Sequence, residues 1–257
     1  MITSTSNAKV KNVTVLMKKS KERNEQGVFL VEGPKMFHEI PEERLEAVFI
    51  SETFRSKYTG DLPDGTEIVS DSVLKAMSGT QTPQGIIALV RQFHYQPEDL
   101  LKGPVPLLLI LEDIQDPGNL GTIFRSAEGA GADGICMSSG CVDVYNPKVI
   151  RSTMGSALRV PFFYTQDIQE ELKRLKNRDF SVYAAHLKGT EDYTRPDYTG
   201  ATAFLIGNES KGLKEETAAL ASCYIRIPMA GRVESLNAGV AASLLAYEAA
   251  RQRGFGA

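Results

Sequence analysis

Cysteine and histidine are scarce in this chain, and their scarcity excludes several kinds of functional site. The 257 residues include three cysteines and three histidines. An odd, sparse set of cysteines does not form a disulfide framework, and one Cys-x4-Cys pair with so few histidines makes a poor zinc site. Scattered histidines give little support to a histidine-based catalytic triad. We therefore expect no metal, and three buried or half-buried free thiols in a reducing cytoplasm.

Long apolar runs are also missing. No stretch approaches the roughly 18 uninterrupted apolar residues that span a bilayer. The N-terminal sequence MITSTSNAKVKN lacks the apolar segment of a secretory signal. Apolar residues nevertheless make up 42% of the chain, which is enough for an ordinary buried core. We expect a cytoplasmic protein with no membrane partner.

The usual signatures of dinucleotide-binding and hydrolytic enzymes fail as well. The glycines at 129–134 match GxGxxG, but they close a helix and precede a strand, which reverses the order that a dinucleotide site needs. Gly207 and Gly212 have P-loop spacing, but Leu213 stands where the phosphate-binding lysine belongs. There is no GxSxG elbow and no HExxH helix. A nicotinamide oxidoreductase is therefore rejected.

Charge is distributed unevenly. The net charge of −3 argues mildly against a protein that binds polyanions over its whole surface. Residues 1–25, however, hold six lysines and arginines against two glutamates. Such a run is either a solvated helix face or an arm that contacts nucleic-acid phosphates, and charge alone does not choose between them.

The first part of the chain alternates short β-rich runs with helical stretches. A basic helical stretch covers 7–20, and another helix begins at Pro34. The β-rich runs are GVFLVEG, EAVFIS, TEIVS and GIIALVRQ, so this part indicates an α/β layer structure. Prolines accumulate where the apolar pattern lapses. We expect a domain at 1–95, a linker at 96–105 and a second domain at 106–257.

The second part opens with PLLLILEDI, a continuous apolar run typical of a buried parallel strand. Further strands are expected at DGICMSS, VPFFYT, FSVYAAHL, TAFLIGNE and CYIRIPM, with helices between most of them. A last helix is expected from about Ser235 to Gln252, rich in alanine, glycine and serine. Small side chains let another backbone approach closely, so this helix should pack tightly against a neighbour in this chain or in a second subunit.

Three polar blocks each follow an apolar strand and turn into a helix. They are DPGNLGTIFRSAEGAG at 116–131, LIGNESKGL at 205–213 and IPMAGRVESLNAGVAASLLAYE at 227–248. Because ligands bind beyond the carboxyl ends of strands in α/β sheets, the blocks predict one shared pocket. Each alone has a simpler interpretation, as a helix cap at Asp116, a turn at Gly207 or a helix cap at Ser235. Their occurrence together favours the pocket.

The three blocks resemble the signature motifs of the SpoU branch of the SPOUT RNA methyltransferases over roughly residues 106–250. The basic N-terminal helix, FLVEG and the TPQGI segment at 82–86 resemble the small α/β RNA-binding domain of ribosomal-RNA members. The resemblance implies an α/β knot domain with a parallel sheet, in which the C-terminal chain threads a loop as a trefoil knot. It also implies a homodimer, with the last helix near the interface.

The resemblance further implies S-adenosylmethionine as the cofactor and methyl transfer to an RNA ribose 2′-hydroxyl. Backbone groups of Gly207, Ile227 and Leu236 match the family's cofactor contacts. Neighbouring positions complete the set: Asn208, Met229, Ala238, Ala185 and Leu187, although relatives often carry Thr where this chain has Ala185.

The residues implied for catalysis are spread over the three blocks. Arg125 corresponds to the motif-one arginine, which is either a general base or an electrostatic partner of the developing alkoxide. Asn119 would orient Arg125 or the ribose, and Glu209 would fix Arg125 or the substrate. Ser235 and Asn237 would face the methyl-transfer centre.

RNA contacts are expected from exposed cations on the first domain and on the NPKVIRSTMGS segment: Lys9, Lys11, Lys18, Lys19, Arg23, Lys148 and Arg151. The separate first domain favours large-subunit ribosomal RNA as the substrate. Transfer RNA is the alternative substrate, and a non-catalytic RNA-binding protein that retains the knot is the alternative function.

Overall fold

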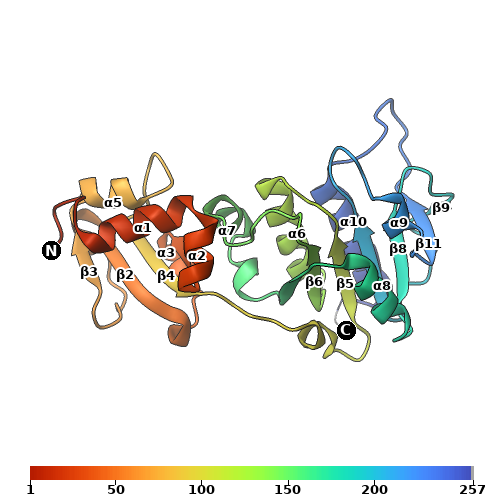
Figure 1. Ribbon diagram of the computed structural model, residues 1–257, viewed down its shortest axis with the longest axis horizontal. Helices are drawn as coiled ribbons and strands as arrows, with labels where there is room; N and C mark the ends of the chain where they lie inside the picture. The colour runs from red at the N-terminus through yellow and green to blue at the C-terminus, as the bar shows by residue number, and fades with distance from the viewer. Residues whose placement is uncertain (256–257) are drawn as a thin grey trace. The chain divides into compact units, whose positions relative to one another are not determined.

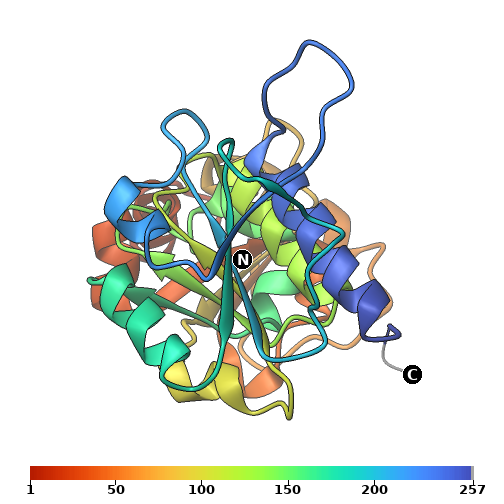
Figure 2. The same cartoon turned by 90° about the vertical axis from the view of Figure 1, so that its right-hand side faces the viewer.

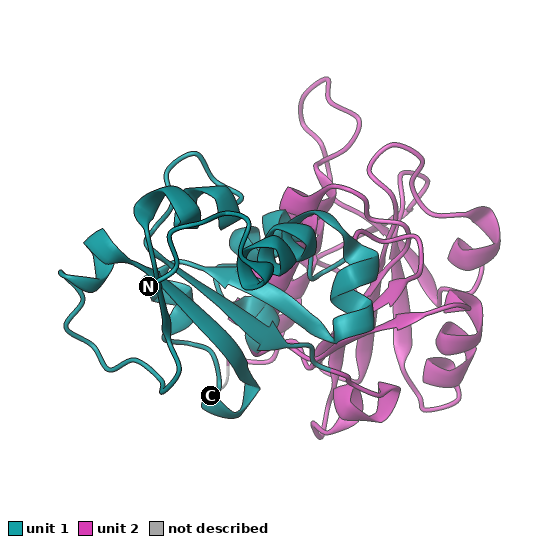
Figure 3. Ribbon diagram, turned by 60° about the vertical axis from the view of Figure 1, so that its left-hand side comes forward, with its two compact units in different colours: residues 1–93, 143–158 teal, residues 94–142, 159–257 magenta. Residues whose placement is uncertain are grey.

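The computed structural model describes residues 1–255 of the chain (Figure 1). These residues form two compact units, which are coloured separately in Figure 3. Unit 1 comprises residues 1–93 and 143–158, and unit 2 comprises residues 94–142 and 159–257. The second unit is therefore interrupted in sequence by a segment that packs with the first.

Unit 1 is built on a four-stranded sheet with the order β1-β4-β2-β3. The strands are β1 (Val28–Glu32), β2 (Leu45–Ser51), β3 (Glu67–Val69) and β4 (Ile86–Arg91). β4 is antiparallel to both β1 and β2, whereas β3 is parallel to β2. The ends of β1 and β2 therefore share one edge of the sheet with the start of β4.

Two helices, α1 (Ala8–Lys18) and α5 (Asp71–Met77), cover one face of this sheet. Val10, Leu16 and Leu74 of these helices form one core with Leu30 of β1. α7 (Pro147–Thr153) also contacts β1, which explains why residues 143–158 belong to unit 1. The shorter elements are α2 (Ser20–Gln26), α3 (Pro34–Phe37), η1 (Glu42–Arg44), α4 (Glu52–Arg55) and η3 (Ser156–Leu158).

Unit 2 contains a seven-stranded sheet with the order β7-β6-β5-β10-β8-β11-β9, in which every pairing is parallel. The strands are β5 (Leu107–Leu111), β6 (Gly134–Ser138), β7 (Phe162–Thr165), β8 (Ser181–Ala185), β9 (Glu191–Asp192), β10 (Thr202–Ile206) and β11 (Cys223–Arg226). β5, β6 and β10 are buried along their whole length, as expected for central parallel strands covered on both faces.

Helices cover both faces of the unit 2 sheet (Figure 2). α6 (Pro117–Gly129) and α10 (Ala238–Gln252) pack together on one face. α8 (Ile168–Lys176) and α9 (Glu215–Ala218) cover the other, where Leu172 and Ala218 share a core with Leu108 and Ile110 of β5. Side chains alternate between the two faces along a strand, so the apolar run of β5 supplies both layers.

The structure differs from the sequence-based organisation in three places. The segment expected as a linker contains η2 (Pro97–Leu101), and its Leu100 is buried in the unit 2 core. Residues 143–158, expected within the second domain, cluster with unit 1. The last helix begins at Ala238, three residues after the expected start at about Ser235, and Asn237 rather than Ser235 caps it. Asn237 Oδ1 accepts the N–H groups of Gly239 and Val240, which is the bonding that defines an N-cap.

The three thiols are free, with Cys136 and Cys141 buried and Cys223 partly exposed. Burial raises the pKa of each thiol, so each resists forming the reactive thiolate. Within residues 1–255, no helix has both the length and the apolar character needed to cross a membrane. In the same range no group of three or more His, Cys, Asp and Glu side chains is arranged to hold a metal ion.

Candidate active site

A cavity of about 840 Å³ lies in unit 2 where β8, β10 and β11 end. Because these strands are parallel neighbours, the loops that follow them meet at one edge of the sheet. These loops and the first two turns of α10 line the cavity. All eight residues expected to contact the cofactor lie in its wall: Ala185, Leu187, Gly207, Asn208, Ile227, Met229, Leu236 and Ala238.

The wall combines apolar surface with a few polar and charged groups. Ile206 and Leu245 add to the apolar surface, while Lys188, Lys211 and Arg226 bring positive charge. The sequence reasoning missed these three cations. Each lies in or just after a predicted strand end, so the rule that ligands bind beyond strand ends was the signal that could have found them.

Gly207 is required by the packing of its own loop. A Cβ atom at this position would lie 2.4 Å from the backbone carbon of Gly212 and from the backbone nitrogen of Leu213. The loop closes here through a pair of backbone hydrogen bonds between Asn208 and Gly212. Close approach of two backbone segments is therefore one reason for this glycine, and the expected backbone contact with the cofactor stays a prediction.

Residues from the three blocks form one hydrogen-bonded chain. Asn119 on α6 donates from Nδ2 to Glu209 Oε1 at 2.8 Å. Asn119 Oδ1 in turn accepts from Asn237 Nδ2 at 2.6 Å. Asn119 is buried, and its own backbone N–H bonds to Asp116, the N-cap of α6. The sequence predicted that the three blocks meet, and this series of hydrogen bonds is the contact between them.

Glu209 is held as a carboxylate. Burial alone would raise its pKa, but donors outweigh that effect and lower it. The Asn119 amide is the strongest of these donors, and the backbone N–H groups of Gln115 and Asp116 add to it. Glu209 therefore carries negative charge at the start of α6 at neutral pH, where the positive end of the helix dipole favours it.

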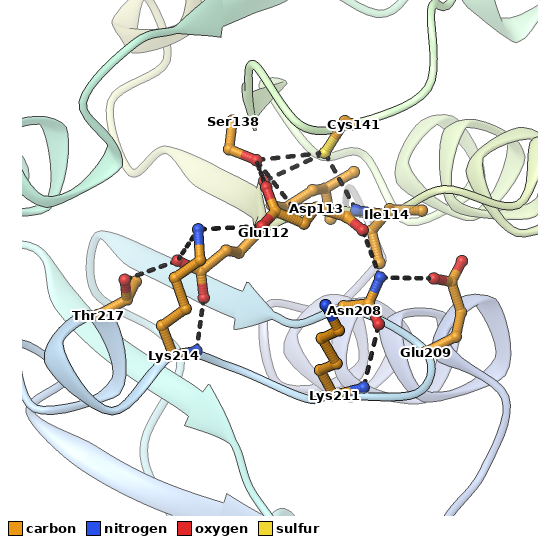
Figure 4. A network of polar contacts seen from close by, with 11 residues as sticks. Glu112, Asp113, Ile114, Ser138, Cys141, Asn208, Glu209, Lys211, Lys214 and Thr217 are labelled. Carbon is orange, nitrogen blue, oxygen red and sulfur yellow. Dashed lines mark hydrogen bonds and ion pairs between the residues drawn. The ribbon is translucent and has the colours of Figure 1, made fainter.

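A second polar network anchors the loop that carries Asn208 and Glu209 (Figure 4). Glu112, at the end of β5, is buried and accepts hydrogen bonds from the Lys214 backbone N–H at 2.8 Å and from Thr217 Oγ1 at 2.6 Å. Lys214 Nζ lies 3.0 Å from Asp113 Oδ2. Asp113 has a left-handed backbone (φ 56°), and its carbonyl accepts from Asn208 Nδ2 at 2.8 Å. Both ends of the loop are thus fixed to the end of β5. The sequence reasoning did not find this network.

Arg125 and Ser235 stand apart from these networks. Both side chains are exposed, and neither forms a hydrogen bond or ion pair with any residue in the described part of the chain. Asn119 and Glu209 bond to each other in that part and not to Arg125, so of the two alternatives expected for each, contact with the ribose or the substrate stays a prediction. Arg125 therefore presents a free guanidinium on the surface of α6, while Ser235 lies on the cavity rim.

The cations expected to bind RNA lie in unit 1, and one of them is unsuitable. Lys11, Lys18, Lys19 and Lys148 are exposed, and Arg151 is half-buried. Lys9 is exposed but forms an ion pair with Glu67.

Arg23 is 3% exposed, because its guanidinium pairs with Asp143 and donates to the Leu16 carbonyl. A buried, paired guanidinium is not available to a phosphate, so the expectation that Arg23 contacts RNA is wrong. Its side chain instead ties residue 143 to α2 within unit 1.

The tight packing expected of α10 occurs within the chain. Ala242 and Ala246 are fully buried, and Gly239 lies against Thr122 of α6. The exposed surface of α10 is different and includes Val240 and Tyr247, each 44% exposed. A neighbouring subunit would meet these larger side chains rather than the alanines.

Comparison with known proteins places this site in a family. The profile of the SpoU rRNA methylase family matches residues 106–247, which span the pocket and all three blocks. The chain belongs to the SpoU rRNA methylase family. The profile of the MRM3-like substrate binding domain matches residues 7–88, which lie in unit 1.

Two relatives of this SpoU chain match nearly its whole length, and a third matches part of it. The 23S rRNA (guanosine(2553)-2′-O)-methyltransferase RlmP of Bacillus subtilis is 32% identical, with 96% of this chain and 97% of that protein covered. The crystal structure of the AdoMet-bound rRNA methyltransferase from Sinorhizobium meliloti superposes with a TM-score of 0.85 at 30% identity, covering 97% of each chain. The A. aeolicus TrmH/SpoU tRNA modifying enzyme matches 62% of this chain and 81% of its own, with a TM-score of 0.53 at 27% identity.

Proposed function

We propose that this protein transfers a methyl group from S-adenosylmethionine to a ribose 2′-hydroxyl of large-subunit ribosomal RNA. The observation that carries the proposal is the cavity at the ends of β8, β10 and β11, next to the chain Glu209–Asn119–Asn237. The cavity wall contains residues of the second and third blocks, and the hydrogen-bonded chain adds the first block. Family membership gives this arrangement its reaction class.

The cavity fits S-adenosylmethionine in size and chemistry. Its volume lies within the range of roughly 300–1,000 Å³ that is typical of small-molecule sites. Leu187, Ile206 and Ile227 offer apolar surface for an adenine, and the loop 207–213 offers backbone groups and the Asn208 side chain. Ser235 and Leu236 bring the third block to the same wall. When bound, the cofactor supplies a methyl group already activated on a sulfonium.

The residues of this chain position the acceptor and handle its proton. A ribose hydroxyl attacks well only when its charge is stabilised as the proton leaves. A guanidinium holds its own proton in proteins, so we assign Arg125 as the electrostatic partner of the developing alkoxide rather than as a general base. Its exposure and its lack of partners among the described residues leave its donors free for a ribose and a phosphate.

Asn119 and Glu209 then act indirectly. They hold the N-terminal ends of α6 and α10 beside the 207–213 loop, which fixes Arg125 and the cavity in one frame. Asn237 combines two tasks, because its oxygen caps α10 while its amide bonds to Asn119. We assign Ser235 to the methyl-transfer centre because it lies on the cavity wall.

Ribosomal RNA is favoured over transfer RNA by the extent of the similarity. The ribosomal-RNA enzymes RlmP and that of Sinorhizobium meliloti match both units of this chain. The tRNA modifying enzyme of A. aeolicus matches 62% of it. Unit 1, with its profile of a substrate binding domain, is therefore the part that supports a ribosomal substrate. We propose a cytoplasmic location.

A homodimer is the assembly that we propose. The support is that α6 and α10 pack together and that their exposed side chains include Arg125 of α6 and the large side chains Val240 and Tyr247 of α10. A second subunit packed against these two helices would cover these side chains and bring further groups toward Arg125. Sedimentation of the wild-type protein at micromolar concentration should give a dimer, and a monomer with full activity would contradict this assembly.

The function is tested by single-turnover methylation with labelled S-adenosylmethionine and saturating large-subunit ribosomal RNA. Wild-type protein should transfer label to a ribose 2′-oxygen. Arg125→Ala should leave cofactor affinity, measured by calorimetry, nearly unchanged while transfer falls at least about a hundredfold. Arg125→Lys should recover little, because a point charge does not replace the planar fork.

The outcomes separate the competing functions. Transfer to transfer RNA alone would replace the ribosomal substrate. Binding of RNA without any transfer would favour a non-catalytic RNA-binding protein. Wild-type turnover by Arg125→Ala would show that the role assigned to this side chain is wrong.

A further inference from the structure

One edge of the sheet in unit 1 carries aromatic and basic side chains that the proposed reaction leaves without a task. β1 ends there at Glu32, β2 ends at Ser51, and β4 begins at Ile86. α3 follows β1 at this edge, α4 follows β2, and the loop 78–85 leads into β4. We call this region the strand-end edge.

The strand-end edge holds a preformed aromatic pair. The rings of His38 and Tyr58 are stacked, with centroids 5.9 Å apart and planes 17° from parallel. Tyr58 Oη and His38 Nε2 are 3.2 Å apart, within hydrogen-bond distance. The ring of Phe54 packs against that of Tyr58, with the two centroids 5.5 Å apart. His38 is exposed and Tyr58 half-buried, so the pair presents ring surface to the solvent with its geometry already fixed.

Three cations lie within three residues of this pair along the chain. Lys35 lies on α3, Arg55 ends α4, and Lys57 precedes Tyr58. All three are exposed, and none forms an ion pair or hydrogen bond through its side chain with another residue in the range 1–255. The acidic side chains on the same segments are Glu39 and Glu52. Positive charge that no protein group neutralises is available to an anionic ligand.

The loop 78–85 is shaped against the same edge. Ser78 and Thr80 donate side-chain hydrogen bonds to the buried carboxylate of Glu32 at 2.5 and 3.0 Å. Gly85 has a left-handed backbone (φ +88°), and a Cβ atom there would overlap the ring of Phe54. Gly79 brings the loop close to Arg151, since a Cβ atom at Gly79 would lie 3.1 Å from its Nη1. A fourth cation therefore adjoins the edge.

We infer that the strand-end edge binds an unpaired segment of the RNA substrate, with a base on the His38–Tyr58 pair and phosphates on Lys35, Arg55 and Lys57. Unpaired bases are recognised by stacking on aromatic side chains, with flanking cations that follow the backbone. Both features occur together here. The inference rests on the proposed function for its choice of RNA, and the match of residues 7–88 to a substrate binding domain supports that choice.

Binding is measured on the full-length protein by fluorescence anisotropy with two labelled RNAs, a single-stranded oligonucleotide and a fully paired hairpin. Tyr58→Ala should weaken binding of the single strand by about tenfold or more, and binding of the hairpin much less. Tyr58→Phe keeps the ring and should bind nearly as the wild type does. Both variants are checked by thermal unfolding.

The cations are tested in the same assay. Lys35→Ala and Arg55→Ala should each weaken single-strand binding and lower the slope of log affinity against log salt by about 0.7. Lys21→Ala is the matched control, because Lys21 is an exposed cation of the same unit that is paired with Glu25. Lys21 lies on α2, which leads into the start of β1, whereas the strand-end edge lies at the end of β1, so the loss of Lys21 should change affinity little.

Wild-type affinity for both cation variants would overturn the inference, even where Tyr58→Ala fails to fold. A folded Tyr58→Ala protein with unchanged single-strand binding would also overturn it, as would preference for the hairpin. These outcomes are independent of methyl transfer. Absence of transfer by the wild type would defeat the proposed function, while loss of single-strand binding in the variants would still support this surface.

Discussion

Removal of the Asn119 side chain should lower the stability of the protein and its rate of methyl transfer, but it should change cofactor affinity little. Asn119→Ala deletes the hydrogen bond to Glu209 at 2.8 Å and the one from Asn237 at 2.6 Å. A hydrogen bond to a charged group contributes about 1.5–3 kcal/mol and a neutral one about 0.5–1.5 kcal/mol. Because Glu209 keeps two backbone donors, we expect the free energy of unfolding to fall by about 2–4 kcal/mol.

The activity should fall further than the cofactor affinity. Asn119 does not line the cavity, so the dissociation constant for S-adenosylmethionine should change little. The N-terminal ends of α6 and α10 lose their shared tie, and a displacement of about 1 Å at a reacting centre costs roughly a hundredfold in rate. Urea unfolding, calorimetry and single-turnover methylation measure the three quantities separately.

Two further variants sharpen this test. Asn119→Asp keeps the shape but places a second carboxylate against Glu209, so its stability should be lowest at neutral pH and recover as the pH falls. Asn177→Ala is the matched control, because Asn177 is an exposed asparagine of the same unit whose loss should cost less than about 0.5 kcal/mol. If Asn119→Ala unfolds at the same urea concentration as Asn177→Ala and methylates at the wild-type rate, the hydrogen bonds of Asn119 do not hold the site together.

Three other predictions follow from the geometry. Ala246→Arg should unfold the protein, because Ala246 is fully buried within the chain, and a folded Ala246→Arg protein would contradict this packing. Tyr247→Arg should leave a folded protein whose sedimentation shifts toward that of a monomer, because Tyr247 is exposed. Glu209→Gln should lower the free energy of unfolding, and the whole of this loss should be present above the ordinary carboxyl pKa of about 4.5. The difference from the wild type should vanish as the pH falls through the lowered pKa of Glu209, so a difference that persists in acid would refute the prediction. Gly207→Val should lower the unfolding temperature as well as cofactor binding, and loss of binding at unchanged stability would support a direct ligand contact.

The sequence was sufficient to predict the features of the fold that rest on a local pattern of residues. The apolar run of β5 and the alternation of strands and helices gave the parallel α/β class, because burial on both faces of a sheet leaves a continuous apolar signal. The second and third polar blocks gave the pocket for the same kind of reason, whereas the first block does not line it and joins the other two through the hydrogen bonds of Asn119. Parallel neighbouring strands deliver their following loops to one edge, so strand order along the chain already implies proximity in space.

The sequence did not predict which side chains that are far apart along the chain bond to each other. Arg23 is one cation in a basic run, and nothing local marks it as the one that pairs with Asp143, 120 residues away. Glu112 and Lys214 likewise carry no local signal of their contact. Such contacts depend on which elements the fold brings together, and that is decided by the packing of the whole chain.

The sequence by itself determined the three blocks, because each is a short local pattern of polar residues after an apolar strand, and their resemblance to the SpoU motifs implied the reaction class. The threading of the C-terminal chain as a knot stays a prediction. Only the tertiary structure decided how those residues are used: Asn119 bonds to Glu209 and Asn237, while Arg125 stays exposed. It also turned the alanines of α10 inward against α6. A helix pattern gives one small face, but the identity of the partner that covers it depends on which surface is nearest once the sheet has formed.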